Sequence, residues 1–271
     1  MNRRMLLAGA AVIFATPASA QADGGMPIVT GQSFQIASNV LGEARKLNVW
    51  LPGTYGEGQQ RYPVLYLLDG GEQEDFHHIS GLANISGAYG VTREFIVVGV
   101  ESGRERRHHM TFLSTLPDDV KAIPLNGGAA EFRRYLAENV IPWVEANFRT
   151  SPERVVMGES LAGLFVVETL LRQPGLFEGY IAIDPSLWWD GGSLVRQRDL
   201  PGWTEMRPRR RVFLALSNQG PEAEVRALAD GLGGTTALTF RPMPEETHGS
   251  IYHPAATYAV RALFAPPPPA P

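Results

Sequence analysis

Residues 155–163 read Val-Val-Met-Gly-Glu-Ser-Leu-Ala-Gly, a β-rich run followed by a G-x-S-x-A-G turn and a helical sequence. This order predicts a buried strand, a sharp turn at Ser160 and a helix that begins at Leu161. The residues two before and two after the serine must be small so that neighbouring backbone can approach, and Gly158 and Ala162 are small. The serine hydroxyl should therefore stand at the end of the strand as a nucleophile. The alternative is a serine that caps an ordinary helix.

Apolar strand-like segments alternate with helical segments on both sides of this turn. The strand-like segments lie at residues 46–51, 62–68, 95–100, 154–157, 180–183, 211–216 and 237–243. The helical segments lie at residues 129–148, with a kink expected at Pro142, and at 161–172, 222–232 and 252–264. This alternation predicts an α/β fold, with a mostly parallel sheet covered by helices on both faces. Ligands of such sheets bind at the carboxyl ends of the strands.

His248 is the candidate general base for the serine. The chain order typical of α/β-hydrolases is Ser, then acid, then His, which leaves only His248 and His253 among the six histidines. His248 lies in a polar loop between the last strand and the last helix, from which it can reach back to Ser160. His253 begins the last helix, where capping or packing is the simpler role.

The acid is expected after the strand at residues 211–216. Glu222 and Glu224 follow in the first turn of a helix, and either can hold the imidazole tautomer. We prefer Glu224, although acids are also favoured at a helix start by the helix dipole alone. Asp184, at the end of the preceding strand, is the alternative acid.

Backbone amides next to two strand ends are the candidate oxyanion donors. The Leu161 N–H lies at the start of the helix that follows the serine. The strand at residues 62–68 ends in Asp69-Gly70-Gly71, whose amides can turn toward the nucleophile. Without that context the Asp-Gly-Gly sequence would be only a turn.

Composition excludes several classes of protein. The chain has 271 residues, of which 44% are hydrophobic and 19% charged, enough for a sizeable core and too apolar for a disordered chain. The net charge of −4 argues against nucleic-acid binding. The absence of cysteine excludes disulfides, thiolate metal sites and cysteine nucleophiles. Adjacent histidine pairs at 77–78 and 108–109 point in different directions, so we expect no metal site.

The N-terminus has the pattern of a secretory signal peptide. Asn2-Arg3-Arg4 is followed by an apolar run over residues 5–15 and by Ala18-Ser19-Ala20, a small-residue cleavage site. The apolar run is too short to cross a bilayer. We therefore expect residues 1–20 to be removed and the protein to be periplasmic or secreted, without stable membrane insertion. Residues 28–264 then form one domain, followed by a proline-rich tail at residues 265–271.

The ordered set of motifs resembles the putative-esterase family of α/β-hydrolases. That family includes esterase D, enterochelin-type siderophore esterases, feruloyl esterases and mycolyltransferases. The motifs that carry the resemblance are LLDG at 67–70, VGV at 98–100, GESLAG at 158–163, DPSLWW at 184–189 and ETHGS at 246–250. The sequence departs from the family at two positions, because Ala162 replaces Gly and Asp184 stands where Ser is commoner.

The resemblance implies ester hydrolysis without metal or organic cofactor, on a small-molecule ester. It implies Ser160 as nucleophile, His248 as base, backbone donors at Leu161 and Gly71, and a carboxylate within residues 217–224. Acyl transfer at the same site, or a catalytically silent binding protein of this fold, are the alternatives.

Three side chains are candidates for substrate binding. Trp188 and Trp189 follow a strand end and can wall an acyl or aryl pocket, unless one of them is core. Arg107, with its neighbours Arg104 and Arg106, can receive an anionic or catecholate substrate, unless these arginines are only solvated.

Overall fold

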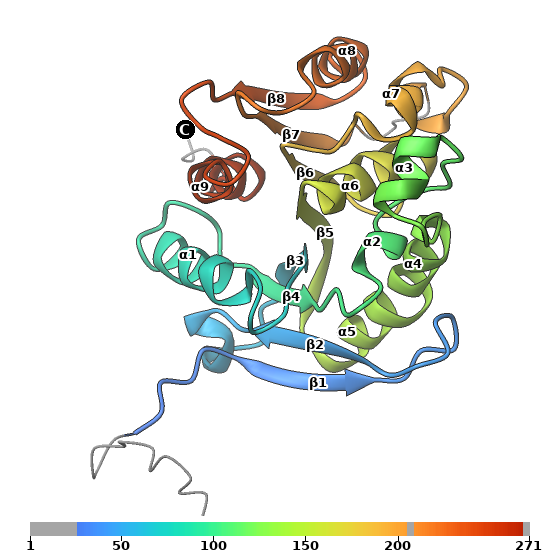
Figure 1. The fold of residues 1–271 in the computed structure, drawn as a ribbon. Helices are drawn as coiled ribbons and strands as arrows, with labels where there is room; N and C mark the ends of the chain where they lie inside the picture. Colours follow the sequence, from blue (N-terminus) through green and yellow to red (C-terminus); the bar gives the residue numbers. More distant parts are fainter. Residues whose placement is uncertain (1–25, 205–208, 268–271) are drawn as a thin grey trace, which may run out of the picture.

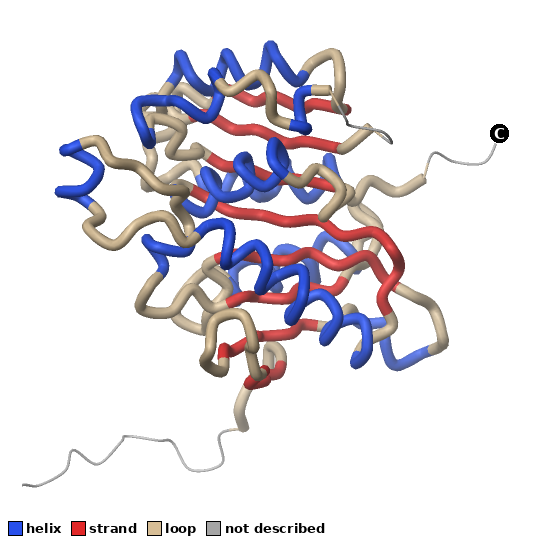
Figure 2. Tube along the Cα trace, turned by 90° about the vertical axis from the view of Figure 1, so that its right-hand side faces the viewer, coloured by secondary structure: helices blue, strands red, loops and turns tan. Residues whose placement is uncertain are grey.

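One eight-stranded sheet runs through the molecule in the order β1-β2-β4-β3-β5-β6-β7-β8. The computed structural model describes residues 26–204 and 209–267. The strands are β1 (Gln32–Ile36), β2 (Arg45–Trp50), β3 (Tyr62–Leu68), β4 (Ile96–Val100), β5 (Thr150–Glu159), β6 (Gly179–Ile183), β7 (Arg211–Leu216) and β8 (Ala237–Pro242). Figure 2 shows the strands side by side across the molecule.

The sheet is mostly parallel, as the sequence predicts. Strands β1 and β2 are antiparallel, β2 pairs antiparallel with β4, and the other neighbouring pairs are parallel. Every residue of β3, β4 and β6 is buried, which explains why these strands are continuous apolar runs and not alternating ones. The predicted α/β fold with a mostly parallel sheet is confirmed.

Helices cover both faces of the sheet (Figure 1). They are α1 (Phe76–Ala88), α2 (Arg106–His109), α3 (Pro117–Ala122), α4 (Ala129–Tyr135), α5 (Ile141–Asn147), α6 (Leu161–Arg172), α7 (Trp189–Arg196), α8 (Glu222–Leu232) and α9 (Tyr252–Leu263), with short 3₁₀ turns at Gly53–Glu57 and Pro201–Trp203. Helices α1 and α9 share one apolar core with the sheet, and α4, α5, α6 and α8 share the other. Side chains of β5 belong to both cores, so the strand before Ser160 is packed on both of its faces.

The structure differs from the predicted elements in two respects. Strand β1 and helices α1, α2, α3 and α7 are additional elements that the sequence patterns did not indicate. The helix predicted at residues 129–148 contains a π-helical turn, Leu136–Val140, directly before Pro142. Proline lacks an N–H and its ring clashes with the preceding turn, so the helix widens there. The predicted signal peptide at residues 1–20 and the end of the predicted tail lie outside the described residues.

Helix α6, which follows the serine, carries a buried ion pair. Glu168 is 1% exposed and pairs with Arg133 from α4 and, at 2.7 Å, with Arg172 one turn further along α6. Burial raises the pKa of Glu168, and the two guanidinium groups act against this. The Arg133–Glu168 pair joins α4 to α6, the helix that begins directly after Ser160.

Candidate active site

Ser160 lies in the sharp turn between β5 and α6. Its backbone has φ 58° and ψ −120°, a conformation that costs energy for a residue with a side chain and that recurs at functional turns. A Cβ on Gly158 would lie 2.6 Å from the Ala162 carbonyl carbon, so only glycine fits there. The Ser160 N–H donates to Ile183 O at 3.1 Å, which ties the turn to β6. The turn thus presents the serine at the carboxyl edge of the sheet.

His248 contacts Ser160 from the loop between β8 and α9. Its Nε2 lies 3.1 Å from Ser160 Oγ, and its Nδ1 lies 2.6 Å from Asp184 Oδ2. The His248 N–H donates to Gln219 Oε1 at 3.1 Å, which fixes this loop against the segment after β7. The structure therefore brings the predicted nucleophile and base into a geometry that permits proton transfer.

Asp184 directly follows β6, with φ 43° and 1% exposure. Its Oδ1 accepts the Ser217 N–H at 2.8 Å, and its Oδ2 accepts the Ser217 hydroxyl at 2.7 Å. Burial raises the pKa of Asp184, but hydrogen bonds from His248 and Ser217 outweigh it and hold the pKa below its ordinary value. The hydrogen bond to Asp184 in turn raises the pKa of His248, although burial of the imidazole acts to lower it. The buried carboxylate can hold the imidazole with its proton on Nδ1.

Neither Glu222 nor Glu224 contacts His248, so the predicted position of the acid is wrong. Glu222 makes an exposed ion pair one turn further along α8, and Glu224 packs against α7. Asp184, which follows β6, contacts His248 instead. Gly220 makes this possible, because a Cβ there would lie 2.3 Å from Asp184 Oδ1. Asp184 was the alternative acid in the sequence.

The two amides expected to bind an oxyanion differ in their surroundings. Leu161 is the first residue of α6, so its N–H lies at the positive end of that helix, next to Ser160. The Gly71 N–H instead donates to Glu74 Oε2 at 2.7 Å. Burial raises the pKa of Glu74, and the hydrogen bond from Gly71 lowers it. An oxyanion that binds the Gly71 N–H must therefore displace the Glu74 carboxylate.

Carboxylates gather beside the serine. Arg106 donates two hydrogen bonds of 2.6 Å to Asp69, in the loop after β3. Burial raises the pKa of Glu159, the residue before the serine, to about 7, while His248 lowers it. Burial and the charge of Asp69 raise the pKa of Asp75 to about 6. Of these carboxylates, Glu159 favours the protonated form of His248.

The three predicted substrate contacts differ in exposure. Trp188 is 47% exposed, whereas Trp189 is buried and donates its Nε1–H to Phe112 O at 2.8 Å. Trp189 therefore belongs to the core and cannot wall a pocket. Arg107 is exposed and makes one long hydrogen bond, 3.4 Å, to Ala122 O. Its side chain is free to move toward a ligand.

Ser186 is a neighbour of the nucleophile that the sequence analysis did not single out. Its Oγ lies 3.4 Å from Ser160 Oγ, and its N–H donates to Ser160 O at 3.0 Å. The sequence pointed to Ser186 only through its position two residues after Asp184, at the end of the strand that follows the Ser160 segment in the chain.

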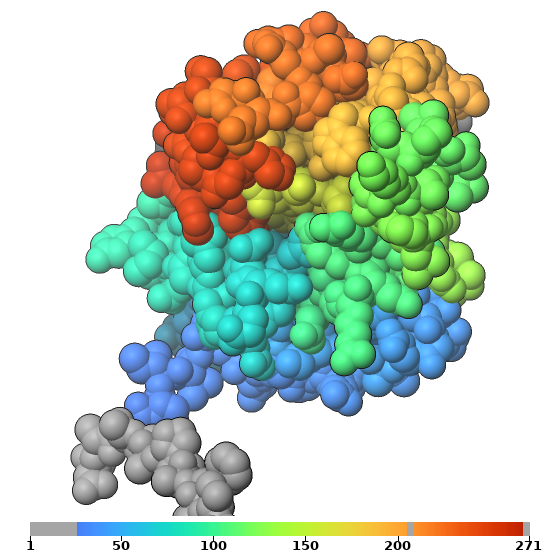
Figure 3. Space-filling model, viewed as in Figure 1, coloured from blue at the N-terminus to red at the C-terminus, as the bar shows by residue number. Residues whose placement is uncertain are grey.

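The face around these residues is hollowed (Figure 3). The yellow surface, which belongs to the segment around the start of α6, forms the floor of the hollow. It is flanked by the cyan loop after β3, the green segment around α2 and the red segment around the start of α9. Within residues 26–204 and 209–267, no group of three or more metal-ligating side chains gathers. No helix in that part of the chain is long and apolar enough to cross a membrane.

Comparisons with known proteins show clear relatives. A family model described as putative esterase matches residues 38–238. The ferri-bacillibactin esterase BesA of Bacillus subtilis is 35% identical over 153 residues, covering 51% of this chain and 52% of BesA. A siderophore enterobactin esterase of Emericella nidulans is 37% identical over 84 residues, covering 30% of this chain and 28% of that protein. The matches thus span about half of the first relative and less than a third of the second.

Solved structures share the fold over most of their length. An IroE-like serine hydrolase from Shewanella oneidensis superposes with a TM-score of 0.75 at 30% identity, covering 86% of this chain and 80% of that one. The BES protein from Bacillus cereus superposes with a TM-score of 0.78 at 21% identity, covering 90% and 99%. The second likeness shows the fold alone.

Proposed function

This chain belongs to the putative esterase family, and we propose that it hydrolyses carboxylic esters through a serine acyl-enzyme. The observation that carries the proposal is the hydrogen-bonded series Ser160–His248–Asp184 at the carboxyl edge of the sheet. The two distances, 3.1 and 2.6 Å, fit a nucleophile, a base and an orienting acid.

In the first half of the reaction the serine is acylated. Ser160 Oγ attacks the ester carbonyl carbon while His248 Nε2 takes the hydroxyl proton. Asp184 stabilises the imidazolium that forms, because its carboxylate is buried and already hydrogen-bonded to Nδ1. When the tetrahedral intermediate collapses, the ester C–O bond breaks and His248 gives the proton to the leaving alkoxide. In the second half water attacks the acyl-enzyme by the same steps and releases the acid and free Ser160.

The oxyanion of each tetrahedral intermediate is stabilised by backbone amides. Leu161 donates from the start of α6, where the helix dipole adds to the hydrogen bond. Gly71 is the second donor, once its N–H has left Glu74. The exchange replaces one negative acceptor by another, so no buried amide is left without a partner.

We assign the substrate to esters with an aryl or acyl group that packs on Trp188, with siderophore lactones as the leading class. Support for the class comes from the names of the relatives in Bacillus and Emericella, which are siderophore esterases. Support for the contact comes from Trp188, a half-exposed aromatic side chain two residues after Ser186.

The test is a panel of esters assayed with the wild type and Ser160→Ala. It includes p-nitrophenyl acetate, short-chain alkyl esters, feruloyl esters and a catecholate trilactone. We expect hydrolysis of at least one class, lost by several orders of magnitude in Ser160→Ala. Trp188→Ala should raise KM for aryl esters more than for acetate. Hydrolysis that persists in Ser160→Ala would overturn the mechanism, and a wild type inactive on every ester would overturn the function.

We further propose that the protein is exported, on the basis of residues 1–20. The apolar run and the Ala18-Ser19-Ala20 site support cleavage before Gln21. Intact-mass analysis of protein from the native host should give a chain that begins at Gln21. Active protein that retains Met1 would contradict export by this route.

A further inference from the structure

We infer that a second site, separate from the catalytic one, binds a small oxyanion with two or more negative charges at the amino edge of the sheet. A cleft of about 640 Å³ lies there, within the range of small-ligand pockets. The side chains that line it are Arg61, Pro63, Arg93, Ser151, Pro152, Glu153, Glu178, Arg209, Arg210 and Arg211. Ser160 is at the other end of β5, roughly 25 Å away for a strand of this length.

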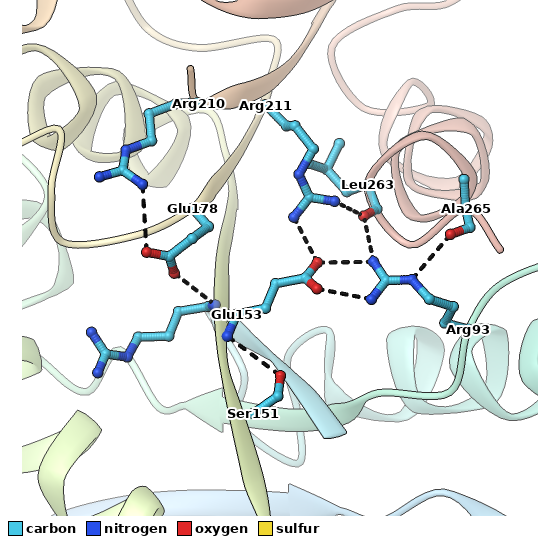
Figure 4. Close-up of polar contacts among 9 residues, drawn as sticks. Arg93, Ser151, Glu153, Glu178, Arg210, Arg211, Leu263 and Ala265 are labelled. Atoms are coloured by element: carbon cyan, nitrogen blue, oxygen red, sulfur yellow. Dashed lines mark hydrogen bonds and ion pairs between the residues drawn. The ribbon is translucent and has the colours of Figure 1, made fainter. Parts of the chain in front are cut away.

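Two of the arginines form a rigid frame around one carboxylate (Figure 4). Arg93 donates two hydrogen bonds to Glu153, at 2.8 and 2.9 Å, and Arg211 donates a third at 2.6 Å. Arg93 also donates to Ala265 O at 3.0 Å, and both arginines contact Leu263 O at the end of α9. One carboxylate therefore balances two guanidinium charges that are fixed in place, and one positive charge remains in excess.

Arg210 is buried without a full set of partners. It is 9% exposed, and its Nη1 lies 3.5 Å from Glu178 Oε1. Its Nε has no hydrogen-bond partner among the residues that the structure describes. Glu178 is also engaged elsewhere, because its Oε2 accepts the Arg154 N–H at 3.0 Å. Burial of an unpaired guanidinium N–H is costly, and an anion in the cleft would remove this cost.

Within the described part of the chain, the two remaining arginines donate hydrogen bonds to carbonyl oxygens only. Arg61 donates to Thr150 O at 3.1 Å, and Arg209 donates to Thr236 O. Among the described residues neither has a carboxylate within 4.0 Å. The Arg154 side chain, at the rim, is matched by Glu145 at 2.5 and 2.8 Å and adds no free charge.

The charges of the cleft define the ligand. Among the described residues, five arginines and two glutamates line the cleft, which leaves about three positive charges without a carboxylate partner. The chain as a whole has the opposite sign, with a net charge of −4. Guanidinium groups bind carboxylate and phosphate oxygens through paired N–H donors. The cleft therefore suits a polycarboxylate or a phosphorylated small molecule, which shares this oxyanion chemistry.

Calorimetric titration with citrate and with inorganic pyrophosphate tests the site. We expect one of the two to bind at one site per chain and to weaken as salt rises from about 50 to about 500 mM. Arg61→Gln and Arg209→Gln should each lower the affinity about fivefold to tenfold. Both side chains are exposed, so these variants should fold. Arg134→Gln, which removes the same charge from an exposed ion pair on α4, should change the affinity less than about twofold.

Two results would overturn the site. One is no binding of either probe below about 10 mM, whether or not the protein binds anionic phosphatidylglycerol vesicles, and the other is an equal loss of affinity in Arg134→Gln. The outcome is independent of the proposed esterase function. Ser160→Ala should bind the probe as the wild type does, and Arg61→Gln and Arg209→Gln should keep full hydrolytic activity.

Discussion

Replacing Asp184 by asparagine should remove most of the activity without unfolding the protein. Oδ1 of Asp184 accepts the Ser217 N–H, so the oxygen of an asparagine must stay at that position. The NH₂ group then takes the place of Oδ2, which lies 2.6 Å from His248 Nδ1 in the wild type. From that position it donates a hydrogen bond to Nδ1. That contact selects the imidazole tautomer with its proton on Nε2, which cannot accept the proton of Ser160.

The size of the effect follows from the lost tautomer and the lost charge. We expect kcat for p-nitrophenyl acetate to fall about 10³- to 10⁴-fold, or about 4–5.5 kcal/mol in activation free energy. KM should stay within about threefold, because Asp184 is 1% exposed and cannot touch the substrate. Steady-state kinetics measure both constants, and circular dichroism checks the fold.

Glu222→Gln and Glu224→Gln are matched controls, since they make the same carboxyl-to-amide change on α8. Both should keep kcat within about twofold, because neither side chain contacts His248. The reasoning is refuted if Asp184→Asn retains more than about a tenth of kcat, or if Glu224→Gln loses as much as Asp184→Asn.

Three further predictions concern the base, the buried ion pair and the oxyanion loop. Because Asp184 raises the pKa of His248 above 6.5 and catalysis needs the neutral imidazole, kcat/KM should rise with pH through a midpoint above 6.5; a lower midpoint in the pH–rate profile would contradict this. Glu168→Ala leaves Arg133 buried without its partner and should lower the free energy of unfolding by about 3–5 kcal/mol in a denaturant titration, whereas a loss below about 1 kcal/mol would count against the pair. Glu74→Gln offers the Gly71 N–H a weaker acceptor, so kcat/KM should rise about twofold to fivefold; a tenfold fall would mean that Glu74 holds the loop in its active form.

The nucleophile turn could be predicted because its requirements are local. Val155 and Val156 favour a strand, Gly158 permits the close approach, and the residues after Ser160 form a helix. His248 could be found by order along the chain, since few histidines follow the serine. The continuous apolar runs in β3 and β4 likewise predict buried parallel strands.

The acid could not be placed because its position depends on contacts between distant segments. Asp184 and Glu224 both follow strands that end at the same edge, so chain order admits either. What decides between them is the Ser217 segment, which donates two hydrogen bonds to Asp184, and the space that Gly220 leaves. The hint that the sequence offered for Asp184 was its position at the end of a strand, where ligands of such sheets bind.

The additional elements have weaker local patterns. Strand β1 lies at the sheet edge and most of its residues are exposed, so it lacks the apolar run of a central strand. Helix α1 contains glycines at 81 and 87 and several polar residues, and its apolar face is narrow. The Glu74 contact with Gly71 also escapes sequence analysis, because it depends on how a short loop folds back.

Active-site labelling tests the central claim most directly, that Ser160 is the nucleophile. The wild type is treated with a fluorophosphonate, digested, and mapped by mass spectrometry. We predict one covalent adduct per chain, on the peptide that contains Ser160, absent in Ser160→Ala and formed far more slowly in His248→Ala. An adduct on another residue, or none on a wild type that hydrolyses esters, would contradict the account.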